Sequence, residues 1–319
     1  MALPFIVGAM VIAAGVTSYM KGSNAADTNQ EAKDIVKEAR GNYCVARERL
    51  QKAKARACDS LSTLGQIKVR VLAKDMISYV YLLKKLKADS QVSQMVSDTQ
   101  WEEIYREIKC MSRLLVDWRE REKEGTAVRE KITFGACSVI PVEENAEQCN
   151  GVAALMAREQ EVMATEDLSQ VDGIINFDED ISGLSFLLDG FDLEKKANKN
   201  LERAKNYYVK VKEANQQMNL VSDAFQAASG RANLLIDLIG KIHKKFHEAM
   251  GQLQEEKSGV PNVDIADQVN LEVLEKLLNL VVAMRKILYL PILYENGSVT
   301  RESFLMYHEI KDALKKMDA

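Results

Sequence analysis

Two histidines four residues apart are the first residues in this chain whose types and spacing could do chemistry. They lie in the segment "HKKFHE" as His243 and His247. In a helix this spacing places both imidazoles on one face, where they could hold a metal ion. The zinc-protease pattern requires Glu directly after the first His, and that position is Lys244. Because Lys244 and Lys245 also repel a cation, the sequence predicts solvated helix surface here and no metal site.

An acidic segment resembles a calcium-binding loop at first inspection. The stretch "NFDEDISG" alternates Asn176, Asp178 and Asp180. An EF-hand loop needs Gly at position six and Glu at position twelve. Those two positions are Ile181 and Leu187. The sequence therefore excludes an EF-hand and leaves at most weak binding of divalent cations.

The sequence lacks the motifs of nucleotide-binding and hydrolytic enzymes. It has no Walker A lysine loop, no G-x-G-x-x-G after a strand and no G-x-S-x-G elbow. The third histidine, His308, lies in an ordinary amphipathic helical pattern. We therefore expect a protein that is not an enzyme and that uses no cofactor.

The elements that must position these residues are predicted to be few, long helices. The chain of 319 residues has only 16 Gly and 4 Pro, and chains with many turns need more of both. No alternating strand segment followed by a hairpin signal occurs. The predicted fold is all-α: a long antiparallel helical hairpin or coiled-coil bundle, with an N-terminal apolar helix and a C-terminal helical pair.

Two long heptad patterns carry this prediction. In residues 28–87, apolar residues recur at alternating steps of four and three, which is the seam of a coiled coil. The first run comprises Ala39, Tyr43, Ala46, Leu50, Ala53 and Ala57. After a local break, the pattern resumes at Leu72, Met76, Tyr79, Leu83 and Leu86.

The second pattern, in residues 214–253, alternates without error and is predicted to assemble helices. The seam residues on which we base this prediction are Met218, Val221, Phe225, Leu235, Ile239, Ile242, Phe246 and Leu253. Upstream, the pattern continues with one slip through Leu201, Ala204, Tyr208 and Val211. The two long helices could pair within one chain or between copies.

These patterns divide the chain into five segments. They are an apolar anchor helix (1–22), a first long basic helix (23–90), shorter helices with an acidic connection (91–191), a second long coiled-coil helix (192–258) and a C-terminal helical hairpin (259–319). The second long helix is expected to end at "KSGVP", because Gly and Pro stop helices. A turn is expected at "YENGS", and a last helix from about Thr300.

Residues 2–20 carry no charge and are followed by Lys21. This length just exceeds the roughly 17 residues that a spanning helix needs, so we expect a membrane anchor. A cleaved signal peptide fits less well because no Lys or Arg precedes the apolar core. A helix sheltered in an oligomer is the third alternative. The residues expected to contact lipid are Pro4, Phe5, Ile6, Val7, Gly8, Ala9, Val11, Ile12, Ala13, Gly15, Val16, Tyr19 and Met20.

The basic residues that follow this anchor predict its orientation. By the positive-inside rule, the bulk of the chain lies on the cytoplasmic side of the cytoplasmic membrane. The five cysteines are an odd number without a C-x-x-C pair. This usage is typical of a reducing compartment and agrees with that orientation.

Charge is strongly segregated along the chain. Residues 31–90 carry 14 Lys and Arg against 7 Asp and Glu, and residues 195–257 carry 12 against 7. Residues 143–194 carry 1 against 14. Basic helices could bind nucleic acid or anionic lipid, but aromatic residues are too sparse along residues 31–90 to favour nucleic acid. We expect the acidic segment to neutralise the basic helices within the fold or between copies.

Three stretches resemble a group of bacterial coiled-coil proteins with an N-terminal apolar helix. They are "EAKDIVKEARGNYCVARERLQKAKARACDSLSTLGQIKVRVL", "YLLKKLK" and "AMRKILYLPILYENGSVTRES". Members of this poorly characterised group are often labelled chemotaxis proteins because of their coiled coils. The resemblance implies long helices at a membrane and little about activity.

Together these features predict a non-enzymatic, membrane-associated scaffold or tether that self-associates through its long helices. Its expected partners are membrane lipid, further copies of the chain and helical proteins, whereas nucleic acid is not expected. One alternative is a pore-forming or membrane-disrupting effector with a releasable N-terminal helix. A second alternative is a chemoreceptor-like signalling relay that binds the helices of a kinase or adaptor.

Overall fold

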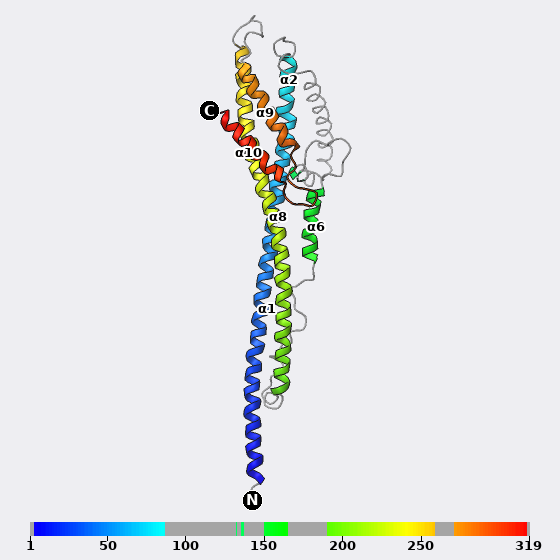
Figure 1. Cartoon of the computed structure of the whole chain (residues 1–319), viewed down its shortest axis with the longest axis vertical. Coiled ribbons are helices and arrows are strands. Elements are labelled where there is room, and N and C mark those ends of the chain that lie inside the picture. Colours follow the sequence, from blue (N-terminus) through cyan, green and yellow to red (C-terminus); the bar gives the residue numbers. More distant parts are fainter. Residues whose placement is uncertain are drawn as a thin grey trace. The chain divides into compact units, whose positions relative to one another are not determined.

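The part of the chain that the structure describes is helical. The computed structural model describes residues 3–86, 132, 135–136, 150–164, 190–258 and 271–317, without the side chains of residues 3–23, 80, 83–86, 150, 190–192, 254–258 and 271. The elements are α1 (Leu3–Arg70), the π-helix η1 (Val71–Met76), α2 (Ile77–Leu86), α6 (Asn150–Ala164), α8 (Gly190–Ser258), α9 (Leu271–Tyr289) and α10 (Arg301–Lys316) (Figure 1). The predicted all-α class is confirmed.

The ends of the second long helix agree with the sequence. α8 begins at Gly190, two residues before the predicted start, and ends at Ser258 within "KSGVP". The backbone of α1 runs without interruption from Leu3 to Arg70, so no boundary separates the predicted anchor from the first long helix. Most of the predicted segment 91–191, including the acidic stretch "NFDEDISG", lies outside the described residues.

The chain forms two compact units, each with its own core. Unit 1 comprises Met1–Gln51 and Glu159–Val221, and unit 2 comprises Lys52–Arg158 and Ser222–Ala319. The first part of α1 packs with the first part of α8 in unit 1. The later part of each helix belongs to unit 2.

In unit 1, α1 and α8 run parallel. Near the start of both helices, Ala25 of α1 forms a buried cluster with Leu193 and Ala197 of α8. Further along, the Asn200 amide donates to Asn29 Oδ1 at 3.0 Å. Residue numbers in contact therefore rise together on both helices, and the two ribbons advance in the same direction (Figure 1). The pairing occurs within one chain.

The predicted antiparallel hairpin is therefore wrong. A hairpin needs only a short connection, whereas a parallel pair needs a connection that returns along the first helix. Residues 87–189 separate α2 from α8, which is ample chain for that return. The prediction rested on the matched lengths of the two helices, and length carries no information about direction.

The seam of unit 1 alternates small and larger residues. On α1, every second layer is alanine, and each of these alanines is at most 7% exposed; they are Ala25, Ala32, Ala39 and Ala46. The layers between them are Asn29, Val36, Tyr43 and Leu50. Small side chains allow two helix backbones to approach closely, and each alanine layer buries little apolar surface.

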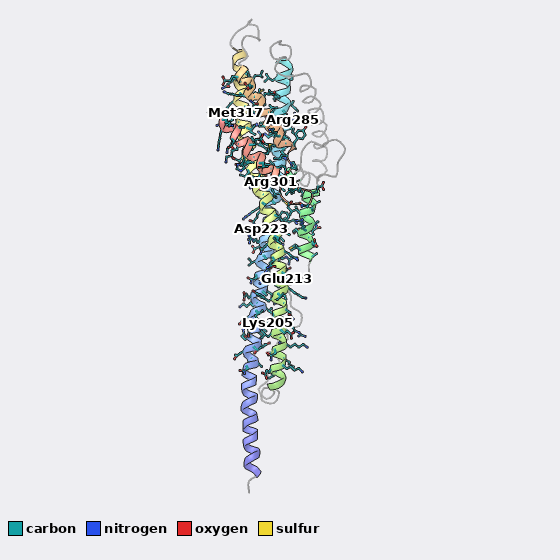
Figure 2. All side chains as sticks on the ribbon, viewed as in Figure 1. Lys205, Glu213, Asp223, Arg285, Arg301 and Met317 are labelled. Atoms are coloured by element: carbon teal, nitrogen blue, oxygen red, sulfur yellow. The ribbon has the colours of Figure 1, made fainter. Side chains whose placement is uncertain are left out.

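The α8 side of this seam has no slip. Its buried residues are Leu193, Ala197, Asn200, Ala204, Tyr207, Val211, Ala214, Met218 and Val221, at alternating steps of four and three. The seam thus passes through Asn200 and Tyr207, and Tyr208 is 37% exposed. Exposed positions on α8 such as Lys205 and Glu213 carry charge (Figure 2).

Unit 2 has a broader core than unit 1. Its first layers are again parallel, because Ser60 Oγ of α1 lies 2.9 Å from Ser229 Oγ of α8, and Asp75 of η1, which follows α1, lies beside His243 further along α8. α9 and α10 add buried apolar residues, including Leu277, Ile287 and Ile310. The Lys68 ammonium group is fully buried and donates to the Leu290 carbonyl oxygen at 3.3 Å.

Backbone contacts at Gly135 and Ala136 tie unit 2 together. The Ala136 carbonyl oxygen accepts a hydrogen bond from the Ile292 amide at 2.7 Å. A Cβ atom at Gly135 would overlap the backbone carbonyl of Leu61 in α1. Only glycine therefore fits at this crossing without movement of α1.

The predicted turn at "YENGS" and the predicted start of the last helix are both confirmed. The turn is closed by bonds from the Tyr294 amide to the Ser298 carbonyl at 2.8 Å and from the Gly297 amide to the Tyr294 carbonyl at 2.9 Å. Gly297 has φ of 79°, a conformation that favours glycine. Thr300 caps α10 by accepting from the Ser303 amide at 3.4 Å.

The predicted anchor falls within the backbone bounds of α1, but the side chains of residues 3–23 lie outside the described ones. The predicted lipid contacts from Pro4 to Met20 are among these residues. Within the portion of the chain that was described, no helix is both long and apolar enough to cross a membrane.

Candidate functional site

The π-helix η1 places a carboxylate on the buried face of unit 2. A π-turn contains one more residue than an α-turn, and such turns are frequent at functional sites. In η1 the residues buried together are two adjacent pairs, Val71 with Leu72 and Asp75 with Met76. Asp75 is drawn into the interior beside its apolar neighbour, and its side chain is only 3% exposed.

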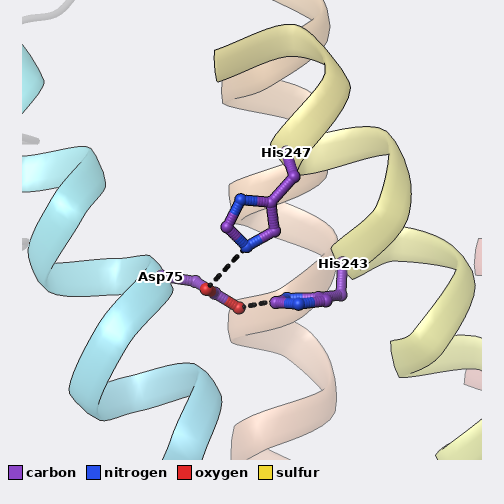
Figure 3. Close-up of side chains that lie close together, drawn as sticks. All are labelled: Asp75, His243 and His247. Carbon is purple, nitrogen blue, oxygen red and sulfur yellow. Dashed lines mark hydrogen bonds and ion pairs between the residues drawn. The ribbon is translucent and has the colours of Figure 1, made fainter. Parts of the chain in front are cut away.

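His243 and His247 on α8 both face this carboxylate (Figure 3). His243 Nδ1 lies 2.7 Å from Asp75 Oδ2, and His247 Nε2 lies 3.4 Å from Asp75 Oδ1. An ionised carboxylate can only accept hydrogen bonds, so the His243 imidazole N–H is the donor in the bond to Asp75, whereas His247 lies within ion-pair distance of the second oxygen. Each carboxylate oxygen is thereby directed at one imidazole, which offsets the cost of burying the charge.

The two imidazoles stand at different depths. The side chain of His243 is 33% exposed and that of His247 is 59% exposed. Their ring centroids are 4.3 Å apart in an edge-to-face arrangement, and Phe246 lies 5.7 Å from the ring of His247. The group is therefore closed by Asp75 on one side and open to solvent on the side of His247.

The sequence found the two histidines but not Asp75. We predicted solvated helix surface for the pair, and the structure instead brings Asp75 to both rings across 168 residues of chain. No sequence signal indicated this. In a regular heptad the position directly before the seam residue Met76 faces solvent, and it is the π-helix that turns Asp75 inward.

The neighbouring lysine does not enter the group. Lys244 is 81% exposed and lies 3.9 Å from Glu248 on the same helix. Residues one position apart on a helix do not share a face, so its charge points away from the imidazoles. The repulsion that we expected from Lys244 therefore acts at a distance and through solvent.

The group has the composition of a metal-binding site. One ligand atom from each of Asp75, His243 and His247 lies within 4.8 Å of the others. The third histidine takes no part, because the ring of His308 packs on Phe304 at 4.4 Å and on Tyr307 at 5.2 Å.

Two other polar side chains of unit 2 are desolvated. Tyr79 is fully buried, its hydroxyl has no hydrogen-bond partner among the described residues, and burial raises the pKa of that hydroxyl. The Arg231 guanidinium lies 4.9 Å from the centre of the Phe304 ring. Burial lowers the pKa of Arg231, and its Nε and Nη1 have no hydrogen-bond partner in the described structure.

The eight predicted seam residues of α8 are all buried. Met218 and Val221 belong to unit 1, the others belong to unit 2, and none is more than 7% exposed. Their burial is accounted for by packing within each unit. A role for them in joining copies of the chain stays a prediction.

Unit 1 contains a cleft of about 400 Å³ beside its seam. α1 contributes Ala39, Asn42, Val45, Ala46 and Arg49, and α8 contributes Tyr208, Val211, Lys212, Asn215, Gln216 and Asn219. Val45 is 66% exposed. The Asn215 side-chain oxygen is buried without a hydrogen-bond partner among the described residues.

Comparisons of the chain with protein-family models, with curated proteins and with solved structures found no match. The resemblance to bacterial coiled-coil proteins stays a prediction. The functional argument therefore rests on the residues and their geometry.

Proposed function

We propose that this chain is a non-enzymatic helical scaffold, tethered to the cytoplasmic membrane by residues 2–20, that self-associates through unit 1. The bulk of the chain then lies on the cytoplasmic side. The observation that carries the proposal is the construction of unit 1, where two parallel helices share an alanine-rich seam and leave a partly apolar cleft beside it.

The thin seam favours further helical contacts. Burial of apolar surface contributes about 25 cal/mol per Å², and an alanine layer buries far less surface than a leucine layer. Ala25, Ala32, Ala39 and Ala46 make half of the α1 layers in unit 1 thin. A further helix that covers the cleft would add the surface that this pair lacks.

The cleft offers such a helix both apolar and polar contacts. Val45 and Tyr208 are exposed apolar residues that line it. The buried oxygen of Asn215 could accept a hydrogen bond from an incoming side chain. A second copy of the chain is the proposed occupant, because in a two-fold dimer each copy covers the cleft of the other.

The start of unit 1 lies close to the proposed anchor in sequence. Ala25, only five positions after Met20, is already packed against Leu193 and Ala197. The basic residues that follow on α1, Lys33 and Lys37, have the placement expected for the cytoplasmic side of an anchor. The parallel pair therefore begins directly after the proposed membrane segment.

Membrane fractionation of the full chain and of a variant lacking residues 2–20 tests the tether. We expect the full chain to resist carbonate washing and to need detergent, and the shortened variant to be released without it. If the full chain is folded and needs no detergent, the constitutive tether is wrong. That result would support the effector that stores its N-terminal helix and releases it.

The signalling relay receives no comparable support. A hairpin relay carries its two long helices antiparallel, whereas in each unit of this chain the paired stretches of α1 and α8 run parallel.

A further inference from the structure

We propose that Asp75, His243 and His247 bind a divalent transition-metal ion of the zinc type, which cross-links η1 to α8 within unit 2 (Figure 3). The proposed scaffold needs no metal, so this inference goes beyond it. It rests on geometry in unit 2 alone and does not depend on the membrane tether or on self-association.

The ligand set matches the chemistry of such an ion. Imidazole nitrogen and carboxylate oxygen are ligands of Zn²⁺, Fe²⁺, Co²⁺ and Ni²⁺, and three protein ligands are the usual number in an open zinc site. Zinc bonds of 2.0–2.1 Å in a tetrahedron place ligand atoms roughly 3.3 Å apart. The two histidine-to-aspartate separations here are 2.7 Å and 3.4 Å.

The remaining adjustment is small and falls on a side chain that has room to move. All three ligand atoms already lie within 4.8 Å of one another. His247 is 59% exposed, so its ring can rotate towards the other two ligands. Asp75 is fixed by its burial in η1, which gives the site one rigid ligand and one adaptable ligand.

Metal binding would replace the hydrogen bond between His243 and Asp75 and the ion-pair contact between His247 and Asp75. Each coordinating nitrogen binds through a lone pair, so the proton on His243 Nδ1 moves to Nε2 or is released, and the equivalent exchange occurs on His247. The carboxylate charge then balances part of the metal charge. Three protein ligands leave a position for water, and the exposed side of His247 gives that water access.

The lysine that directly follows His243 does not point at the site. Lys244 is directed to solvent beside Glu248. Two of the three histidines of the chain lie in this group, one helical turn apart and on the same face of α8.

Metal titration of the purified full chain, stripped with a chelator, tests the proposal. We expect one Zn²⁺ per chain by calorimetry, visible absorption bands from Co²⁺ at the same stoichiometry, and a higher unfolding midpoint with Zn²⁺. His247→Gln should weaken binding by at least about a hundredfold. Because His247 is exposed, this variant should keep the unfolding midpoint of the metal-free parent.

His308→Gln is the matched control, because it also removes one histidine from a helix of unit 2 but lies outside the group. It should bind Zn²⁺ as the parent does. The proposal is overturned if the parent chain shows no saturable binding of either metal. Equal affinity of the parent and His247→Gln for Zn²⁺ would overturn it as well, since the ion would then bind elsewhere.

Discussion

Units 1 and 2 both hold a stretch of α1 against a stretch of α8, but they do so with different chemistry. Unit 1 repeats one pattern, with alanine at every second layer of α1. Unit 2 uses contacts that occur once: Ser60 lies against Ser229 and Asp75 lies beside His243.

The difference concerns how the register of the two helices is fixed. A repeating seam looks similar after a shift of seven residues, so its apolar layers alone select the register weakly. Among the described layers of unit 1, the buried pair Asn29 and Asn200 forms a polar layer that interrupts the apolar repeat. In unit 2, a shift of α8 would leave the buried Asp75 carboxylate without His243 and His247, and the register there is therefore fixed by a buried charge.

Truncation of one buried leucine in each unit should give the largest loss of unfolding free energy among these predictions, and the loss should differ between the two units. Leu64 in unit 2 and Leu50 in unit 1 both lie on α1 and are both 0% exposed. We expect Leu64→Ala to cost about 4 kcal/mol and Leu50→Ala about 3 kcal/mol of unfolding free energy. The smaller loss follows because thin alanine layers flank Leu50, so the helices can close part of the cavity.

Hydrogen exchange read separately over each unit measures these losses. It also shows whether each truncation acts on its own unit. A loss in Leu50→Ala equal to or larger than that in Leu64→Ala would mean that unit 1 closes the cavity no better than unit 2 does.

Glycine-to-alanine substitutions should have opposite signs in the two units. A Cβ at Gly135 would overlap the Leu61 carbonyl, so Gly135→Ala should destabilise unit 2 by roughly 1–3 kcal/mol. Gly41 of α1 has no atom within 4 Å of such a Cβ. Gly41→Ala should therefore stabilise the helix by about 0.5–1 kcal/mol. Chemical denaturation measures both, and a neutral Gly135→Ala would contradict the close backbone crossing.

Replacement of the polar layer tests how unit 1 chooses its register. Asn200→Leu alone leaves the buried Asn29 amide without its partner and should cost about 1–3 kcal/mol. Asn29→Leu with Asn200→Leu should recover this loss but relax the register. Spin labels at the exposed positions Glu31 and Lys205 report the outcome. We expect one narrow distance distribution in the parent and a broader one in the double variant.

If the double variant keeps a single narrow distribution, the asparagine layer does not select the register. The apolar layers of unit 1 would then be sufficient, and the contrast with unit 2 would be smaller than we describe.

The smallest expected effect concerns an unpartnered hydroxyl in unit 2. Tyr79→Phe removes a buried group that has no hydrogen-bond partner among the described residues, so it should raise the unfolding free energy by about 1 kcal/mol. Thermal unfolding checks the sign. A destabilised variant would show that the hydroxyl has a partner and that unit 2 contains a further polar contact.

The sequence was informative where local chemistry decides the structure. The scarcity of Gly and Pro and the heptad steps predicted long helices, and α8 ends where "KSGVP" indicated. The turn closed by Gly297 and the cap at Thr300 were also predicted, because both depend on residues within a few positions.

The sequence was misleading where long-range geometry decides. Heptad spacing is the same for parallel and antiparallel pairs, so the direction of α8 could not be read from it. Asn200 and Tyr207 are the buried seam residues, but the sequence predicted Leu201 and Tyr208 instead, because their neighbouring positions fit the heptad spacing nearly as well. Asp75 was missed because its partners lie on another helix, and the register that joins them is a property of the folded chain.

Sedimentation velocity of the full chain in detergent, compared with Val45→Glu, tests self-association through unit 1 most directly. Val45 is 66% exposed and lines the cleft, so the substitution should not disturb the seam. We expect the parent to sediment as an oligomer and Val45→Glu to sediment as a monomer with an unchanged unfolding midpoint. A monomeric parent, or an oligomer that Val45→Glu leaves intact, would contradict the proposed assembly.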